Sequence, residues 1–420
     1  MSESVSVSVI IPIYNGERYL DSCLTAIRQS AYAPYEIIVV DNGSTDDSVE
    51  TARRHGIGVV SCPGPSGPGA ARNRGAHLAK GQILLFVDAD VVIKPDTLSR
   101  VVATFQEQPD VAAVFGSYDD RPAAQNFLSQ YKNLVHHFVH QHARTEASTF
   151  WGGCGAIRKE IFHKIGGYDQ AKYPTASVED IEMGARMHRS GYRIMLDKQV
   201  QVKHLKEWRL ISLLRTDIFC RAIPWTKLIL ESQETVNDLN LHTSQRISAG
   251  LVGIAVMLAP LAFVEPLMSL ALLLPLGLIL TLNRRLFGFF LRHKGFQFAV
   301  SAFPIHLLYF FYSGVIFATY WACYCLPTRA ANPFMWLEKW RGLFSRTSEP
   351  IDHLEVKLPA SYNLGDAHES GVIPDPLRKI STYRSALTRT SLRIEPSVNF
   401  STFGKALHEK ETGPFDCSTG

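Results

Sequence analysis

The sequence is short of the features that mark several common protein classes. Only seven of its 420 residues are cysteine, an odd number at scattered spacings without a Cys-x-x-Cys pair. This pattern excludes a disulfide-rich scaffold and favours a reducing compartment for the first half of the chain. The N-terminus lacks the basic stretch that begins a signal peptide, so we expect the first domain to stay in the cytosol.

An excess of charge of one sign is also missing. Lys and Arg number 43 and Asp and Glu number 39, which gives a formal net charge of +4. No basic run is interleaved with aromatic residues, so we expect no nucleic-acid partner. The sequence also contains no Gly-Lys-Ser/Thr phosphate loop and no GxGxxG fingerprint, which argues against the nucleotide sites that these motifs build.

The first part of the chain alternates strand and helix patterns. Short apolar runs predict strands at residues 5–13, 35–40, 58–61 and 82–87. Helical spacing of apolar side chains predicts helices at residues 17–29, 46–55, 69–79 and 94–106. This rhythm predicts an α/β fold with a mostly parallel, Rossmann-like sheet covered by helices on both faces. Less regular patterns predict helices at 127–142, 178–190 and 210–231, and short strands at 192–196 and 200–202.

The composition then becomes strongly apolar. Residues 247–282 contain one acid, Glu265, and no base, which is too long for a single membrane span of about 20 residues. Pro260 and Glu265 therefore predict two short spans or a hairpin, and residues 296–326 predict a further span. A basic segment between them is expected as a cytoplasmic loop and comprises Arg284, Arg285, Arg292, His293 and Lys294. Such length without charge disfavours the alternative, a buried helical core.

We therefore expect three parts: an α/β domain at residues 1–235, two to three transmembrane helices at 247–326, and a juxtamembrane segment with a poorly ordered polar tail at 327–420. Trp336 and Trp340, with basic neighbours, are typical of a helix at a membrane interface. Two spans would leave the tail in the cytosol, and three would place it outside.

Carboxylates follow two of the predicted buried strands. Asp88 and Asp90 form a DxD directly after residues 82–87, and Asp41 follows residues 35–40. Ligands of open α/β sheets bind off the carboxyl ends of the strands, so these side chains are expected to face the site. A divalent metal on a diphosphate needs only one or two protein carboxylates, because the substrate supplies the remaining oxygens.

Two further motifs begin predicted helices. The glycine-rich stretch 66–75 places Arg72 and Arg74 in the first turns of a helix, where arginine suits phosphate or base recognition. The second motif gathers the acids Glu179, Asp180 and Glu182. Acids are favourable at the positive end of any helix, and the functional alternative is a general base that takes a proton from an acceptor hydroxyl.

Together these motifs resemble the successive blocks of the family 2 glycosyltransferases, which are inverting enzymes with the GT-A fold. The blocks are IIPIYNGERYL, VVDNGSTDDS, GPGAARNRG, LLFVDADVVI, WGGCGAIRKEIF with IGGYDQ, and VEDIEMGARMHRSGYRI. The resemblance covers roughly residues 5–230 and extends little into the apolar region or the tail.

The resemblance implies roles for individual residues. On the donor side, Asp41 would recognise the nucleobase, Arg72 would line the nucleotide pocket, and Asp88 would contact the ribose or sugar. The first loop around the base and ribose would comprise Pro12, Tyr14 and Glu17. Asp90 would ligate Mg²⁺ or Mn²⁺ on the diphosphate, and His204 matches a position near the metal or the leaving diphosphate.

The remaining roles concern the acceptor. Asp180 would be the catalytic base, with Glu179 shaping its surroundings, and the acceptor side would comprise Gly153, Arg221 and Trp225. Processive synthases of the family carry a Gln-x-x-Arg-Trp block, whereas here three residues separate Arg221 from Trp225 and the Gln is missing. We therefore expect a non-processive enzyme. Asn42 also replaces the second Asp of the usual VDDGS block, which puts a role for that acid in doubt.

The resulting hypothesis is an inverting transferase that moves a sugar from a UDP- or GDP-sugar to a lipid or a lipid-linked glycan at the cytoplasmic face of the cell membrane. The alternatives are a processive polysaccharide synthase, a nucleotidyltransferase that makes activated sugars, and an inactive membrane scaffold. A nucleotidyltransferase would need a Gly-rich loop with a Lys after the first strand, and residues 12–17 lack one. His136 and His140 lack a carboxylate at zincin spacing, so a polar helix is favoured there over a second metal site.

Overall fold

The computed structural model describes residues 5–62, 66–232, 242–265 and 268–325. Its first half is the predicted α/β arrangement. Four parallel strands pair in the order β3-β2-β1-β4, with bounds β1 Val7–Ile13, β2 Tyr35–Asp41, β3 Val59–Ser61 and β4 Ile83–Val87. The predicted tail, with Trp336 and Trp340, lies outside the described residues.

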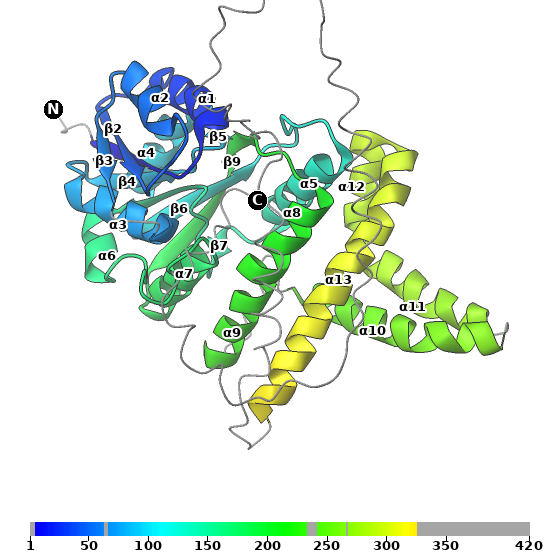
Figure 1. The fold of residues 1–420 in the computed structure, drawn as a ribbon. Helices are drawn as coiled ribbons and strands as arrows, with labels where there is room; N and C mark the ends of the chain where they lie inside the picture. The colour runs from blue at the N-terminus through cyan, green and yellow to red at the C-terminus, as the bar shows by residue number, and fades with distance from the viewer. Residues whose placement is uncertain (1–4, 63–65, 233–241, 266–267, 326–420) are drawn as a thin grey trace, which may run out of the picture. The chain divides into compact units, whose positions relative to one another are not determined.

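Helices cover both faces of this sheet because successive strand residues point to opposite sides. On one face, Val9 and Ile11 of β1 pack with α1 (Glu17–Arg28), α2 (Ser48–Arg54) and α4 (Thr97–Glu107). On the other face, Ile10 packs with α3 (Gly67–Leu78), α6 (Lys159–Lys164) and α7 (Glu179–Arg189). The predicted parallel sheet with two covered faces is therefore confirmed for this half (Figure 1).

Beyond β4 the sheet is mixed. The antiparallel strand β8 (Cys154–Arg158) lies between β4 and β6 (Val111–Tyr118), and β6 then pairs in parallel with β9 (Arg193–His204). Two short strands, β5 (Val91–Val92) and β7 (Glu146–Ala147), pair antiparallel to β9. The strand β6 was not predicted from the sequence, and its central position is evident only from its pairing with β8 and β9.

The strand β9 corrects the prediction of two short strands. Its pairing with β6 shifts, so that Leu196 lies opposite Phe115 but Gln201 lies opposite Ser117. The polar residues 197–199 occupy this irregularity, and they interrupted the apolar pattern without ending the strand. At the same place a Cβ on Gly116 would lie 2.1 Å from the carbonyl oxygen of Val200, so the backbones meet where only glycine fits.

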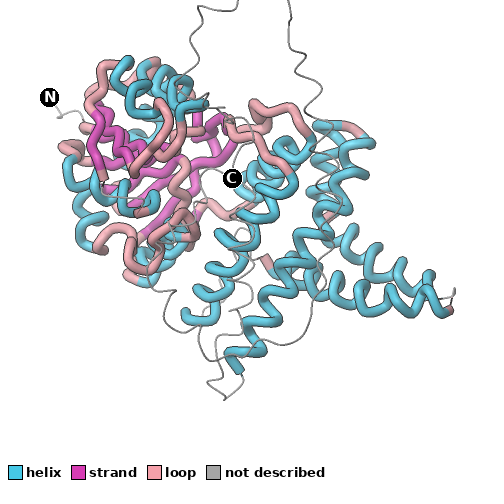
Figure 2. The backbone as a smooth tube through the Cα atoms, viewed as in Figure 1, coloured by secondary structure: helices cyan, strands magenta, loops and turns pink. Residues whose placement is uncertain are grey.

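After β9 the described chain is helical (Figure 2). The first helices are α8 (Leu210–Arg215), a π-helical segment (Thr216–Ala222) and α9 (Ile223–Ser232). They are followed by α10 (Thr243–Val264), α11 (Met268–Leu282), α12 (Arg284–Lys294) and α13 (Phe296–Cys325). The remaining helix, α5 (Phe127–His142), matches its predicted bounds and precedes β8.

Among the described helices, two are long and apolar enough to cross a membrane, namely Thr243–Leu261 of α10 and Phe296–Cys325 of α13. Helices α11 and α12 pass the same test only together and are bent by 71°. These lengths agree with the two to three spans expected from the composition.

The basic segment predicted as a loop is instead the helix α12. Phe287 and Phe290 are buried against α13, and Phe289 packs on His137 and Phe138 of α5. Large apolar residues at helical spacing stabilise α12 as an amphipathic helix, whose basic side chains remain exposed. The prediction of a loop rested on the basic residues and did not take the helical spacing of the aromatic residues into account.

Gly184 offers a test of how closely α7 approaches the Gly-rich segment before β8. A Cβ at this position would lie 2.1 Å from the backbone nitrogen of Phe150. We expect Gly184→Ala to lower the free energy of unfolding by about 1–3 kcal/mol, because an overpacked helix must shift. Denaturant unfolding of the detergent-purified chain measures this effect. Gly250→Ala in α10, where nothing lies within 4 Å of the added Cβ, is the matched control and should be neutral or stabilising.

Candidate active site

A buried arginine joins two of the acidic motifs. Arg72, whose side chain is 5% exposed, donates from Nη2 to Asp88 Oδ1 at 2.7 Å and from Nη1 to Glu179 Oε1 at 2.9 Å. The second oxygen of Glu179 accepts the backbone N–H of Ser177 at 2.8 Å. Arg72 thus holds the carboxyl end of β4 against the N-terminus of α7, although 107 residues separate Arg72 from Glu179.

Glycines at the start of α3 bring this arginine into place. Gly67 has a φ of +79°, and a Cβ there would lie 2.8 Å from the carbonyl oxygen of Pro174. A Cβ on Gly152 would lie 3.2 Å from Arg72 Cζ, so the residue before Gly153 must also be small. The glycine-rich stretch therefore supports a buried ion-pair bridge through close packing.

Asp180 lies beside this bridge and is held by two backbone donors. Its Oδ2 accepts the N–H of Gly152 at 2.9 Å, and its Oδ1 accepts the N–H of Ile181 at 2.8 Å. Burial and the neighbouring charge of Glu179 raise the pKa of Asp180 to about 7, against the opposing effect of these donors and of Arg72. A carboxylate with this pKa can accept a proton near neutral pH.

Asp90 and His204 form the third part of the cluster. His204 Nε2 lies 3.4 Å from Asp90 Oδ2, because β5 pairs the DxD segment with the end of β9. Burial would raise the pKa of Asp90, but the nearby His204 and Lys206 outweigh burial and lower it. By contrast, burial and the charge of Asp90 raise the pKa of Asp88 despite its contact with Arg72. The two acids of the DxD therefore have different environments.

The ring of Tyr118, at the end of β6, supports His204. The two rings stack with centroids 4.2 Å apart and an interplanar angle of 13°. The ring of His136, in α5, also packs on Tyr118, with ring centroids 4.3 Å apart. Burial and the charges of Asp90 and Asp88 raise the pKa of Tyr118, to which Asp180 also contributes. The hydroxyl thus lies within electrostatic reach of all three aspartates, which the structure gathers into one cluster.

The donor set fits a metal ion that is shared with a substrate. Asp90 offers a carboxylate and His204 an imidazole, and in the described part of the chain no three His, Cys, Asp or Glu side chains form a closed metal site. Mg²⁺ accepts few protein ligands when phosphate oxygens complete its shell, and Mn²⁺ accepts the same oxygen ligands. Asp90 and His204 would hold such an ion.

The loops after β1 and β2 bind each other. Asn15 accepts the N–H of Thr45 at 2.8 Å, and Glu17 accepts the N–H of Asp47 at 3.3 Å. Asp41 ends β2 and accepts the N–H of Ser44 at 3.0 Å. These contacts hold two predicted donor-side residues, Glu17 and Asp41, near the carboxyl ends of neighbouring strands. Two more, Pro12 and Tyr14, lie at the end of β1 and directly after it.

Asn42 has a structural role in the same region. Its side chain is buried, and its Oδ1 accepts both the N–H and the hydroxyl of Ser66 at 3.1 and 3.0 Å. The bond ties the loop after β2 to the start of α3. The amide oxygen of Asn42 therefore has a structural role at this position.

The three predicted acceptor-side residues lie on different elements. The carbonyl oxygen of Gly153 accepts the backbone N–H of Asp88 at 3.2 Å, so Gly153 lies beside the cluster. Arg221, at the end of the π-helical segment, donates to Asp217 Oδ1 at 2.9 Å. Trp225 lies one turn further along, in α9.

Asp217 belongs to a buried network that the sequence did not reveal. Lys132 of α5 donates to both of its carboxylate oxygens at 2.7 Å, and Tyr312 of α13 donates to Oδ2 at 2.8 Å. A second contact to α13 joins Tyr131 to His306 at 2.8 Å. No sequence motif links these positions, which lie 85 and 95 residues apart for Lys132 and Tyr312.

Three histidines of α5, namely His136, His137 and His140, pack against other side chains of the protein, whereas His142 is exposed. His136 and His140 stack with centroids 3.9 Å apart, and His140 Nδ1 lies 3.1 Å from the carbonyl oxygen of Gly116. Burial lowers the pKa of His140 to about 4. The imidazoles of His136 and His140 pack beside Trp151, and among the described residues they belong to no group of three metal-ligating side chains.

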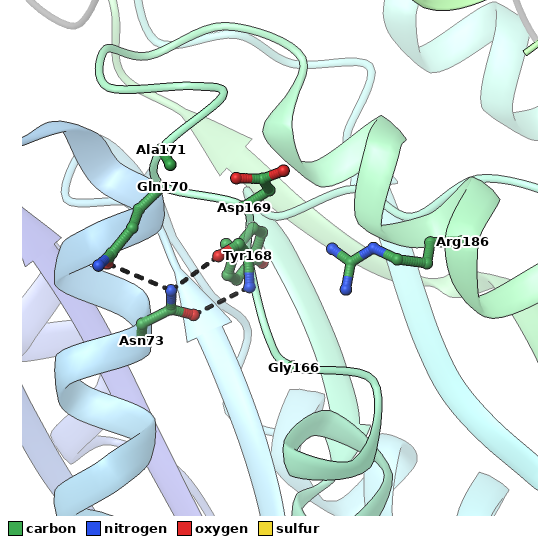
Figure 3. Close-up of a pocket in the computed structure, with 7 residues that line it drawn as sticks. All are labelled: Asn73, Gly166, Tyr168, Asp169, Gln170, Ala171 and Arg186. Atoms are coloured by element: carbon green, nitrogen blue, oxygen red, sulfur yellow. Dashed lines mark hydrogen bonds between the residues drawn. The ribbon is translucent and has the colours of Figure 1, made fainter.

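A pocket of about 440 Å³ is lined mainly by residues 166–171 of the loop before α7. Its lining is Asn73, Gly166, Tyr168, Asp169, Gln170, Ala171 and Arg186 (Figure 3), which includes none of the predicted site residues. Asn73 binds both backbone groups of Tyr168, donating at 2.8 Å and accepting at 2.9 Å. Arg186 is held by Glu182 at 2.8 Å, so these residues fix the loop that packs on Arg72.

Comparison with known families gives two matches. The family described as "Glycosyl transferase family 2" matches residues 8–166, and the one described as "N-terminal domain of galactosyltransferase" matches residues 132–208. Both matches agree with the α/β sheet described above and confirm the predicted fold class, a GT-A-like sheet followed by helices long and apolar enough for a membrane.

Individual relatives match over shorter lengths. The glycosyltransferase GlyG of Streptococcus pneumoniae is 34% identical over 117 residues, which cover 27% of this chain and 38% of GlyG. The glycosyltransferase AglE of Haloferax volcanii is 38% identical over 105 residues, 23% of this chain and 34% of AglE. The matches thus span little more than a third of these relatives.

Among solved structures, the mannosyltransferase PcManGT of Pyrobaculum calidifontis, in complex with GDP-Man and Mn²⁺, aligns with a TM-score of 0.48. Its identity to this chain is 17%, and the alignment covers 76% of this chain and 88% of that structure.

The Arg72 bridge can be tested by stability. Arg72→Met would leave the carboxylates of Asp88 and Glu179 buried without their partner, so we expect the free energy of unfolding to fall by about 3–5 kcal/mol. Lys172→Met is the matched control, because its ion pair with Glu231 is exposed and should contribute less than about 1 kcal/mol. Denaturant unfolding at pH 8 measures both, and equal losses would contradict the bridge as a major contribution to stability.

Proposed function

Residues 8–166 place the chain in glycosyl transferase family 2, and we propose that it is an inverting enzyme that moves a sugar from a UDP- or GDP-sugar to an acceptor hydroxyl. The observation that carries this proposal is the joint position of Asp88, Asp90 and Asp180. One carboxylate has the pKa of a general base, and another lies beside an imidazole in a pair suited to a cation.

In the proposed reaction, Asp180 accepts the proton of the acceptor hydroxyl. The acceptor oxygen attacks the anomeric carbon as the bond from that carbon to the diphosphate oxygen breaks. The nucleoside diphosphate leaves with the bonding electron pair, and a single displacement inverts the anomeric centre. Glu179 takes no proton in this scheme, because Arg72 and the Ser177 N–H occupy its oxygens, and it keeps Asp180 basic through its charge.

The other groups bind and orient. We propose that Pro12, Tyr14, Glu17 and Asp41 surround the base and ribose, which their positions at the ends of β1 and β2 support. Asp88 contacts the ribose or the sugar while Arg72 fixes its direction. A bound Mg²⁺ or Mn²⁺ would supply positive charge to the leaving diphosphate, and Tyr118 keeps the His204 imidazole beside Asp90.

We further propose that the enzyme is a multi-pass protein of the cytoplasmic membrane, with its catalytic domain at residues 1–235 in the cytosol and its spans within residues 247–326. The apolar helices α10 and α13 support membrane insertion, and the exposed basic residues of α12 favour the cytoplasmic side. A lipid or a lipid-linked glycan is then the acceptor. The departure from the Gln-x-x-Arg-Trp block supports a single transfer over processive synthesis.

Asp180 sets the expected pH dependence. Since only its ionised form accepts a proton and its pKa is about 7, kcat/KM should fall about tenfold per pH unit below pH 7 and level off above it. Release of nucleoside diphosphate from a panel of UDP- and GDP-sugars with Mn²⁺ measures the rate. Asp180→Asn should lower kcat by about two to four orders of magnitude and should spare donor binding. The exposed Asp110→Asn is the control, and an unchanged rate in Asp180→Asn would rule out this base.

Asp90 sets the expected metal dependence. Asp90→Ala should weaken binding of Mn²⁺ in the presence of a nucleoside diphosphate by more than about tenfold, because a direct ligand matters at least as much as its supporting residues. Titration calorimetry measures the affinity independently of turnover. Asp96→Ala, which removes an acid of the surface pair with Arg100, should leave it unchanged. Equal affinities in the two variants would refute the assignment of Asp90.

A further inference from the structure

We propose that the exposed basic side of α12 binds the anionic headgroups of phospholipids at the membrane surface. This side is named the α12 basic surface here, and it consists of Arg284, Arg285, Arg292 and Lys294. The inference rests on the membrane insertion in the proposed function and is independent of the chemistry assigned to the acidic cluster. It gives the chain a lipid partner in addition to its acceptor.

The two sides of α12 differ in character. Phe287 and Phe290 are buried in the cluster that joins α12 to α13 and α5. Arg284, Arg285 and Arg292 are exposed. Because each residue turns the helix by about 100°, these three arginines lie on the side opposite the phenylalanines. The helix therefore presents its charges away from the protein core.

The place of α12 in the chain brings it to the boundary of the membrane. The apolar helix α11 ends at Leu282 and the apolar helix α13 begins at Phe296, so α12 connects the two. It is bent by 71° from α11 and therefore does not continue in the direction of that helix. Leu291 and Phe296, beside the basic residues, are 49% and 75% exposed. Exposed apolar side chains next to basic ones are typical of a helix in the headgroup region.

Contacts at Asn283 determine the end of the apolar helices at which α12 lies. Asn283, the residue before α12, donates from Nδ2 to Ser248 Oγ at 3.0 Å and accepts from Gln245 Nε2 at 3.1 Å. Both partners belong to the first turns of α10, which follows the α/β domain in the chain. The helices α10 and α11 therefore form a hairpin, and α12 begins at the end of it where the chain leaves the α/β domain.

The charge of the α12 basic surface is not neutralised by the part of the chain that the structure describes. The sequence of α12 contains no acid. The contact of α12 with a described carboxylate is made by His293, whose Nε2 lies 3.7 Å from Asp120 Oδ2, and the four residues of the basic surface form no ion pair within the described ranges. Like charges at this density favour an anionic ligand, and the guanidinium fork suits phosphate oxygens. A second copy of the chain would present the same positive charge, which disfavours it as the occupant.

The helix is held in place before any lipid binds. The ring of Phe289 packs on His137 and Phe138 of α5, with centroids 5.8 and 5.5 Å apart (Figure 1). The surface is thus preformed, and lipid binding does not have to order the helix. His137 Nδ1 in turn lies 2.8 Å from the carbonyl oxygen of Tyr118. Lipid contact would therefore fix α5, and with it the end of β6 at the acidic cluster, relative to the membrane.

The test measures how strongly the full chain prefers phosphatidylglycerol over phosphatidylcholine. The immobilised chain is equilibrated with micelles of a neutral detergent that contain both lipids, and the retained lipids are quantified. Two variants each remove two charges, Arg284→Gln with Arg285→Gln and Arg292→Gln with Lys294→Gln. Each should lower the preference about 25-fold at low salt, because one basic residue near an anionic surface contributes about fivefold. The preference of the parent protein should also fall as sodium chloride is added.

Arg53→Gln with Arg54→Gln is the matched control. These two residues are also adjacent, exposed arginines of a helix, but they lie in α2 on the α/β sheet. The control removes the same charge as each α12 variant and should keep the parental preference. Since all of these side chains are exposed, the thermal unfolding midpoints should stay close to that of the parent protein.

Two results would overturn the lipid site. One is a preference for phosphatidylglycerol that persists in both α12 variants or falls equally in the control. The other is binding of glycerol 1-phosphate as tight as that of phosphatidylglycerol, which would assign the surface to a soluble phosphate. Release of nucleoside diphosphate in neutral detergent does not use this surface, so its rate should be unchanged in the α12 variants. That rate tests the proposed transferase chemistry separately.

Discussion

The architecture of the site depends on the neutralisation of one buried positive charge. Arg72 is almost fully enclosed and binds Asp88 and Glu179 from two distant parts of the chain. A buried ion without partners costs several kcal/mol, so β4, α3 and α7 can pack together only when both carboxylates are in place. The same contact orients Asp88. Burial and the charge of Glu179 raise the pKa of Asp180 against the opposing effect of Arg72, which keeps Asp180 basic.

Close backbone packing allows Arg72 to reach both Asp88 and Glu179. Gly67, Gly152 and Gly184 each lie where a Cβ would crowd the backbone of another segment or Arg72 itself. Removing a side chain at these points lets helix ends approach the Gly-rich segment before β8, and the N–H of Gly152 then reaches Asp180. Gly152 thus has two effects: its lack of a side chain leaves room for Arg72, and its N–H stabilises the carboxylate of Asp180.

A second buried carboxylate, that of Asp217, joins α5 and the π-helical segment to the apolar helix α13. Asp217 gathers Lys132 from α5, Arg221 from its own segment and Tyr312 from α13. Burial would raise the pKa of Asp217, but the two cations outweigh burial and lower it, so the carboxylate stays charged and retains all its partners. The helix α13, which is long and apolar enough to cross a membrane, is thereby joined to the π-helical segment.

Local sequence patterns were enough to predict β1 to β4 and α1 to α4, because apolar runs and helical spacing extend over short segments. They also indicated that Asp41, Asp88 and Asp90 lie at the ends of buried strands. The short strand β5 was not predicted. The same local view overlooked β6, divided β9 and took α12 for a loop. The sequence by itself determined the fold class and the acidic motifs, and it indicated the resemblance to the family 2 glycosyltransferases. Only the tertiary structure decided that Arg72 bridges Asp88 and Glu179, that Tyr118 stacks on His204 and that Tyr312 binds Asp217, since such contacts join residues far apart in the chain and depend on how helices and strands pack.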